Sequence, residues 1–113
     1  MKYIKTYEEV NSNLLIVTKL GFLSLVKELI EAGANIDFQD DDGETALMIA
    51  SNFVHIEIVR ELIKAGADWN IKDNDNRDFL DHLLTVIKKQ IIEEFPEKYQ
   101  NYLIKKDAEK YNL

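Results

Sequence analysis

An acidic segment with a glycine is the part of the sequence that looks most like a metal site. It reads DFQDDDGE, from Asp37 to Glu44, and holds five acids and no base. A calcium loop needs oxygen ligands at fixed positions, with glycine sixth and a bidentate acid twelfth. Placing Gly43 sixth puts Phe38 first and Ile49 twelfth, and neither side chain can bind calcium. The segment therefore predicts a β-turn, where Asp and Gly favour local hydrogen bonds and positive φ.

The histidines give little support for catalysis. His82 follows Asp78 by one helical turn, a spacing that could orient an imidazole but is more often a helix-surface pair. The chain has no cysteine and no glycine-rich phosphate loop, and no plausible nucleophile accompanies the histidines. We therefore expect that the protein is not an enzyme and that it has no catalytic, cofactor-binding or metal-binding residue.

A repeat of 33 residues is the strongest signal in the chain. VKELIEAGANIDFQD, residues 26–40, returns as VRELIKAGADWNIKD, residues 59–73, with eight of fifteen positions identical. Each copy places apolar residues at helical spacing, followed by Gly33 or Gly66 where a helix ends in the left-handed conformation. Each repeat therefore predicts a turn, two helices and an extended link.

These patterns predict where the helices lie. Thr45 is placed to cap a helix that begins near Ala46. The third unit has no glycine between its helices, so residues 78–95 are predicted to form either one long helix or two. A last helix with Pro96 in its first turn is expected to cap the stack. The other predicted segments are Ser12–Lys19, Phe22–Glu31, Ala46 to Asn52–Val54, and Ile56–Lys64.

The period and the segments DDDGETALMIA and HIEIVRELIKAGADWN resemble the ankyrin repeat family, whose pattern is Asp-x-x-Gly-x-Thr-Pro-Leu-His-x-Ala. The resemblance implies a single all-α domain over residues 1–113, an ankyrin-type α-solenoid of about three helix-turn-helix units. The units are 7–39, 40–72 and 73–105, with a C-terminal capping helix and a tail at 106–113. The sequence departs from the family at Ala46, Met48, Val54 and Asn76, where proline, histidine, glycine and glycine are usual.

The resemblance also implies where a partner would bind. Turn tips project along one edge of such folds, and first helices end on the concave, partner-facing side. The acidic tip at residues 37–44 is either a solvated edge or an electrostatic contact. Leu20 and Phe53 are equivalent positions at those ends, and they are expected to form an apolar anchor, although both could instead tuck under the next unit. Trp69 is expected in the core and His55 in a structural turn. The predicted partner-binding residues are Lys19, Leu20, Gln39, Asp41, Asp42, Glu44, Asn52, Phe53, Lys72, Asn74, Asp75 and Arg77.

The net charge of −7 narrows the class of partner. It argues against nucleic acid and anionic membranes and favours a protein that is basic at its contact. No apolar run is long enough for a signal segment or a membrane span. We therefore expect a cytoplasmic, monomeric, non-enzymatic protein-interaction module. The alternative is an inhibitor or immunity-type protein that masks a basic toxin or enzyme.

Overall fold

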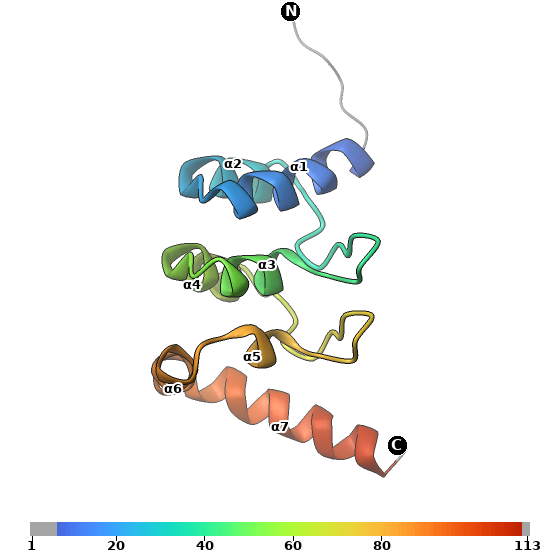
Figure 1. Cartoon of the computed structure of the whole chain (residues 1–113), viewed down its shortest axis with the longest axis vertical. Coiled ribbons are helices and arrows are strands. Elements are labelled where there is room, and N and C mark those ends of the chain that lie inside the picture. Colours follow the sequence, from blue (N-terminus) through green and yellow to red (C-terminus); the bar gives the residue numbers. More distant parts are fainter. Residues whose placement is uncertain (1–6, 112–113) are drawn as a thin grey trace, which may run out of the picture.

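The computed structural model describes residues 7–111, which form seven α-helices and no β-strand. None of these helices is both long and apolar enough to cross a membrane. The helices follow one another in three pairs and a single last helix (Figure 1). In chain order they are α1 (Tyr7–Leu20), α2 (Leu23–Glu31), α3 (Ala46–Asn52), α4 (Ile56–Lys64), α5 (Phe79–His82), α6 (Thr85–Glu94) and α7 (Pro96–Lys110).

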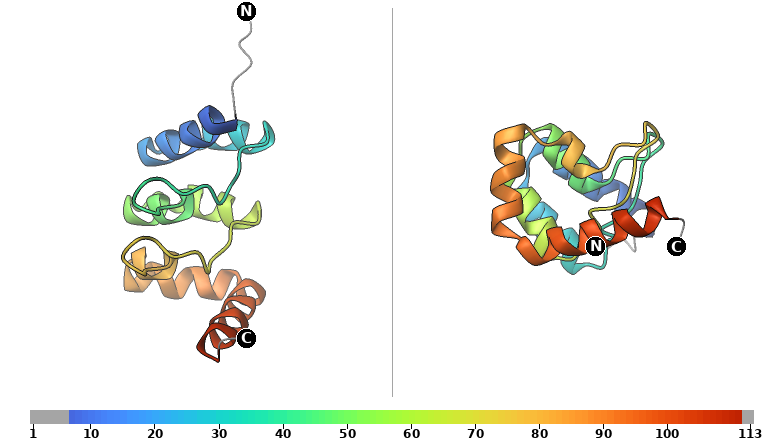
Figure 2. Two further views of the ribbon diagram at one scale, coloured as in Figure 1. Left: turned by 90° about the vertical axis from the view of Figure 1, so that its right-hand side faces the viewer. Right: turned by 90° about the horizontal axis from the view of Figure 1, so that it is seen from below.

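The pairs stack as three layers (Figures 1 and 2). The first helices form one row, in which α1 contacts α3 and α3 contacts α5, while α2 contacts α4 in a second row. The loops that join one pair to the next project from the same side of the stack, and we call residues 37–44 and 70–77 the second and third fingers. The turns within the pairs lie on the opposite side (Figure 1). This arrangement confirms the predicted all-α solenoid.

The repeated apolar positions explain the stacking. Val26 in α2 and Val59 in α4 are fully buried, as are Leu62 and Ile63. A helix pair cannot bury these faces on its own, so each layer depends on its neighbours. The predicted cap is also present, because the Thr45 hydroxyl accepts a hydrogen bond of 3.3 Å from the Met48 backbone N–H.

Of the two arrangements left open for residues 78–95, the structure has two helices. α5 ends at His82 and α6 begins at Thr85, with an extended residue, Leu83, between them. Leu83 is buried, and in α6 Ile91 is fully buried. A continuous helix would carry these side chains away from the layer above. Arg60 of α4 also holds Glu94 of α6 through two hydrogen bonds of 2.8 Å.

The last helix caps the stack, as expected. The ring of Tyr102 is buried beside Trp69, with the ring centroids 6.2 Å apart, and Trp69 packs edge-on against Phe79 at 4.8 Å. Trp69 is only 4% exposed, so its predicted place in the core is confirmed. The Asn70 side chain donates a hydrogen bond of 3.0 Å to the Tyr102 carbonyl, which ties the third finger to α7. The apolar end of the array is therefore covered.

Candidate partner-binding groove

In each finger, one aspartate side chain accepts the hydrogen bonds that shape the turn. The Asp40 Oδ1 atom accepts hydrogen bonds from the backbone N–H groups of Asp42 and Glu44, at 3.0 and 2.9 Å. Asp73, 33 residues later, accepts the equivalent bonds from the residues two and four positions on, at 2.9 and 3.0 Å. These carboxylates replace backbone partners within the turn. The acids that suggested a calcium loop thus include one that shapes the turn itself.

The two fingers are joined side by side. The Gln39 side chain donates to the carbonyls of Gly43 and Lys72, at 2.8 and 3.1 Å. The Asn74 side chain donates to the Asp41 carbonyl at 2.7 Å, and the Asn74 backbone N–H donates to the next carbonyl at 3.0 Å. Gln39 and Asn74 were predicted to contact a partner. In the structure their amides are used to hold one finger against the other.

The fingers differ in charge. Within the described residues, the side chains of Asp41 and Asp42 make no hydrogen bond or ion pair, and both residues are exposed. In the third finger, Arg77 lies 3.2 Å from both Asp73 and Asp75. Lys72 lies 3.6 Å from Glu109 of α7. The second finger therefore presents unpaired negative charge, whereas the acids of the third finger are largely balanced.

A hollow of about 390 Å³ separates the second finger from α1. Its lining is mainly apolar, and Lys19 and Asp41 are the charged residues beside Asp40 that line it. Ile16, which is 55% exposed, lines it but was not among the predicted contacts. The sequence held a signal for this residue, because the four apolar residues 14–17 cannot all face the core of one helix. The lining residues are Ser12, Leu15, Ile16, Lys19, Phe38, Gln39, Asp40, Asp41 and Ile49.

A smaller hollow of about 300 Å³ lies where the two fingers meet. Polar and charged side chains surround it, and five of the predicted contact residues are among them. We call these two hollows, with the fingers that border them, the finger groove. The residues that line the smaller hollow are Asp42, Glu44, Asp73, Asn74, Asp75 and Arg77.

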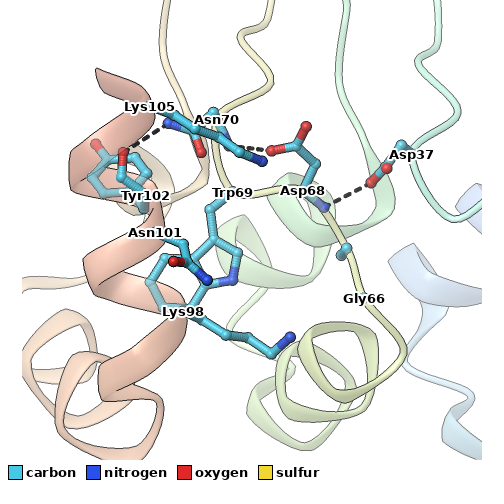
Figure 3. A pocket seen from close by; sticks show the side chains of 10 residues that line it. Asp37, Gly66, Asp68, Trp69, Asn70, Lys98, Asn101, Tyr102 and Lys105 are labelled. Carbon is cyan, nitrogen blue, oxygen red and sulfur yellow. Dashed lines mark hydrogen bonds between the residues drawn. The ribbon is translucent and has the colours of Figure 1, made fainter. Parts of the chain in front are cut away.

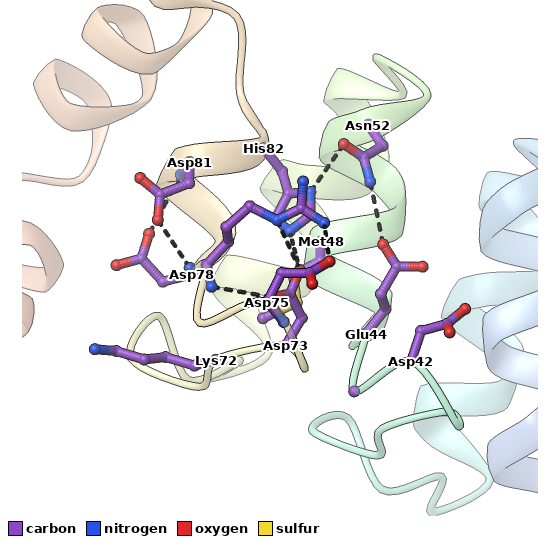
Figure 4. Close-up of polar contacts among 12 residues, drawn as sticks. Asp42, Glu44, Met48, Asn52, Lys72, Asp73, Asp75, Asp78, Asp81 and His82 are labelled. Carbon is purple, nitrogen blue, oxygen red and sulfur yellow. Dashed lines mark hydrogen bonds and ion pairs between the residues drawn. The ribbon is translucent and has the colours of Figure 1, made fainter.

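The ring of His82 is part of a chain of hydrogen bonds, and the predicted surface pair with Asp78 is wrong (Figure 4). Its Nε2 lies 3.0 Å from Asp73 Oδ2 and its Nδ1 lies 2.9 Å from Asn52 Oδ1, while the Asn52 amide donates to Glu44 at 3.3 Å. The side chain of His82 is only 3% exposed. Asp78 turns away to cap α5, since it accepts from the Asp81 backbone N–H at 3.2 Å.

The surroundings of two carboxylates shift their pKa values in opposite directions. Burial acts to raise the pKa of Asp73, but hydrogen bonds from the backbones of Arg77 and Asp75 and from His82, with the charge of Arg77, hold it below its usual value. Burial raises the pKa of Glu44, and the charge of Asp40 adds to this effect. The Asp73 carboxylate is therefore a stabilised anion, and the negative charge of Glu44 is opposed by its surroundings.

Two groups of side chains within the described residues bring three possible metal-ligand atoms within 4.8 Å of one another. One joins Asp40 and Asp42 to Glu44, and the other joins Glu44 to Asp73 and His82. Both depend on carboxylates whose oxygens already accept backbone N–H groups in the fingers. Their positions are thus explained by the turns, and we assign no metal to them.

A third hollow, of about 330 Å³, lies between α7 and the links that follow α2 and α4 (Figure 3). Asp37 projects into this region, and its carboxylate accepts a hydrogen bond of 2.9 Å from the Asp68 backbone N–H. Burial raises the pKa of Asp37. The indole N–H of Trp69 has no hydrogen-bond partner among the described residues. Asp37 joins two links of the stack here, so only part of the acidic segment faces the finger groove.

The remaining predicted contacts lie at the ends of the first helices. Leu20 and Phe53 are 58% and 49% exposed, so neither tucks fully under a neighbouring unit. They do not line the hollow beside Ile16, although Lys19 does. Their role as an anchor for a partner stays a prediction.

Comparison with known proteins agrees with this geometry. The family model of ankyrin repeats (3 copies) matches residues 11–94, most of the chain, and the chain therefore belongs to the ankyrin repeat family. A search of the curated proteins finds no match. Among solved structures, the chain is similar to the ankyrin repeat domain of Bcl-3, described as a unique member of the IkappaB protein family. The TM-score is 0.67 and the identity 30% over 71% of this chain, which spans 35% of that one. Ankyrin repeats are generally protein–protein interaction modules.

Proposed function

We propose that this chain is a non-enzymatic, cytoplasmic and monomeric module that binds a basic segment of another protein in the finger groove. One observation carries the proposal. The free carboxylate of Asp41 stands beside an apolar hollow that contains the exposed side chain of Ile16, and the free carboxylate of Asp42 borders the polar hollow where the fingers meet. A partner that offers a Lys or Arg next to an apolar side chain would match both features. Apolar anchors ringed by polar groups are typical of binding hot spots.

Charge and apolar contact are expected to act on different steps of binding. The unpaired carboxylates would attract a basic partner over distance and raise the association rate, an effect that salt screens. The hollow would hold an apolar side chain and thus slow dissociation. Lys19, which also lines the hollow, would favour a partner whose charge is not uniformly basic.

The partner can be identified by placing a photo-reactive amino acid at position 16 and, as a control, at Lys27 on the exposed surface of α2. A protein that crosslinks only from position 16 is then tested with an Asp41→Ser/Asp42→Ser variant. We expect slower association and a weaker salt dependence. The matched control is Glu31→Ser/Glu93→Ser, which changes the net charge equally at exposed positions outside the groove.

An Ile16→Ser variant tests the apolar part of the groove separately, and we expect it to raise the dissociation rate. Equal effects of the finger variant and its charge-matched control would contradict the proposed site. A captured partner that is a basic toxin or enzyme would extend the proposal to the inhibitor or immunity role.

A further inference from the structure

Most of the large exposed apolar side chains gather at the three interhelical turns. Ten such side chains are exposed among the described residues, and six of them lie in these turns or within two residues of them. We call these six side chains the apolar turn edge. They are Leu20, Phe22, Phe53, Val54, Leu84 and Val86.

The turn edge crosses every layer of the stack. The turns lie one below another on the side opposite the fingers (Figure 1). At the first turn, Phe22 and its neighbours surround a shallow hollow of about 490 Å³, which is lined mainly by apolar atoms. Large apolar side chains that are exposed along one edge of every layer point to an interaction site.

The central side chain of the edge is held in place. The Lys19 ammonium lies 5.7 Å from the centre of the Phe53 ring, and the His55 ring stacks on Phe53 with the ring centroids 6.2 Å apart. His55 is itself fixed by a hydrogen bond of 3.0 Å between its Nε2 and the Lys19 carbonyl. An exposed ring that is already ordered loses little freedom when a partner covers it.

The backbone of Val54 has a conformation that is energetically unfavourable for valine. Its φ is +58°, in the left-handed region that favours glycine, and its side chain is 44% exposed. A β-branched residue is a clear outlier there. The side chain gains little from burial in this chain, so the fold alone does not explain why it is present.

The charged residues around the apolar turn edge are mainly basic, whereas the chain as a whole is acidic. The turns and their flanking residues, 19–25, 52–57 and 83–89, contain three lysines, Lys19, Lys88 and Lys89. They contain a single acid, Glu57, which is paired with Arg60. The chain as a whole carries −7. A partner at this edge therefore meets apolar side chains bordered by positive charge.

We infer that the apolar turn edge is a second docking surface, which binds an acidic amphipathic segment of a partner protein. The apolar face of that segment would cover the side chains of Phe53 and its neighbours. Its Asp or Glu residues would pair with Lys19 at one end of the edge and with Lys88 and Lys89 at the other. This surface shares Lys19 with the finger groove but otherwise consists of different residues, and it selects the opposite charge.

The test uses two designed helical peptides that share a leucine face and differ only in carrying Glu or Lys on the other face. Binding is followed by backbone amide chemical shifts of the whole chain. We expect the Glu peptide to shift amides in the three turns and to bind at least about tenfold more tightly than the Lys peptide. Equal binding of the two peptides, no binding of either, or shifts confined to the fingers would overturn the inference.

Two variants separate binding from folding. Phe53→Ser should weaken the Glu peptide about tenfold or more. Val54→Gly should also weaken it, yet raise the melting temperature, because it relieves the backbone while removing a contact. If Val54→Gly and the finger variant Asp41→Ser/Asp42→Ser lower the affinity equally, the edge is not the binding site.

Other occupants of the edge give distinct results. Sedimentation that shows a concentration-dependent dimer, lost in Phe53→Ser, would assign the edge to a second copy of the chain instead. Binding to vesicles of anionic phospholipid through the same turns would assign it to a membrane surface. Either result would contradict the inferred acidic partner.

Discussion

The second and third fingers have the same hydrogen-bonded turn in different surroundings. Asp40 and Asp73 accept equivalent backbone hydrogen bonds. The turn residue with positive φ is Gly43 in one finger and Asn76 in the other, with φ of +77° and +64°. The comparison shows that one aspartate suffices to define the turn. The residues around it are then set by what lies against each finger.

Close approach explains why glycine is needed in only one of the two fingers. A Cβ atom at Gly43 would lie 2.8 Å from the Asn74 backbone nitrogen and 3.0 Å from the Asp73 Cα, both in the finger below. Asn76 is exposed and tolerates positive φ, as asparagine commonly does. The missing glycine of the third finger therefore reflects its place as the last finger.

The largest difference between the two fingers is expected when the turn aspartate is removed, because the losses of stability should be unequal. Asp73→Ala should lower the free energy of unfolding by about 4 kcal/mol, because two backbone N–H groups and the His82 ring lose a buried, charged hydrogen-bond partner. Asp40→Ala should lower it by about 1 kcal/mol, since Asp40 is only partly buried and accepts hydrogen bonds from backbone N–H groups. Urea unfolding measures both, and equal losses would show that the buried network adds nothing.

The same aspartate should make stability depend on pH. The pKa of Asp73 is lowered in the folded chain, so its contribution is present above the usual aspartate value of about 3.9 and is lost as the pH falls through the lower folded pKa. Unfolding free energies from neutral pH to about pH 3 should fall more steeply in the parent chain than in Asp73→Asn. Parallel curves would contradict this assignment.

Substituting each of the two turn residues with positive φ should change the stability by unequal amounts. Gly43→Asn should destabilise the chain by about 3 kcal/mol, because the new Cβ meets backbone atoms of the third finger. Asn76→Gly should change stability by only about 0.5 kcal/mol, since it relieves φ but frees the unfolded chain. Thermal unfolding of the two variants checks the comparison, and similar losses would show that φ alone decides the residue.

The helix caps that follow the two fingers should also differ in how much they contribute to stability. The Tyr102 hydroxyl donates a hydrogen bond of 2.6 Å to the cap carboxylate of Asp78. Tyr102→Phe should therefore lower the free energy of unfolding by about 2 kcal/mol. Thr45→Ala, at the equivalent cap, should cost about 1 kcal/mol through loss of its own bond to the Met48 N–H. A smaller loss for Tyr102→Phe would show that α7 holds the third unit mainly by apolar packing.

One substitution is expected to increase stability. Val54→Gly should raise the free energy of unfolding by about 1 kcal/mol, because glycine adopts the φ of +58° without strain. The third unit offers the contrast, since Leu83 and Leu84 join α5 to α6 in extended conformations. Leu84→Gly should therefore give no gain, and a gain in both variants would point to a general effect of exposed apolar side chains.

The sequence predicted the parts of the fold that repeat. The 33-residue offset located α2, α4 and the fingers, because equivalent apolar positions face equivalent neighbours. It left open whether the chain breaks between α5 and α6, since that break depends on burying Leu83 and Ile91 in the folded stack. His82 was misassigned for a similar reason. Its partners Asp73 and Asn52 are distant in sequence, whereas Asp78 is close.

The groove was predicted in part. The charge of Asp41 and Asp42 could be read from the sequence, and both residues are exposed. The sequence could not show that their carboxylates lack an ion-pair partner, because this depends on Arg77 pairing with acids of its own finger. The amides of Gln39 and Asn74 looked equally available, yet they join the fingers. Composition indicates which side chains could bind a partner, and only the packing of neighbouring units shows which are already used.

The contact of α7 with the third unit limits how the array can change in length. The ring of Tyr102 and its bond to Asp78 occupy the surface on which a further unit would stack. A duplicated copy of residues 40–72 could be accommodated upstream of that contact, since its Gly43 would allow another finger to lie against it. A copy placed after the third unit would have to displace the helix. Lengthening of this protein, by evolution or by engineering, is therefore expected by insertion in the interior of the array.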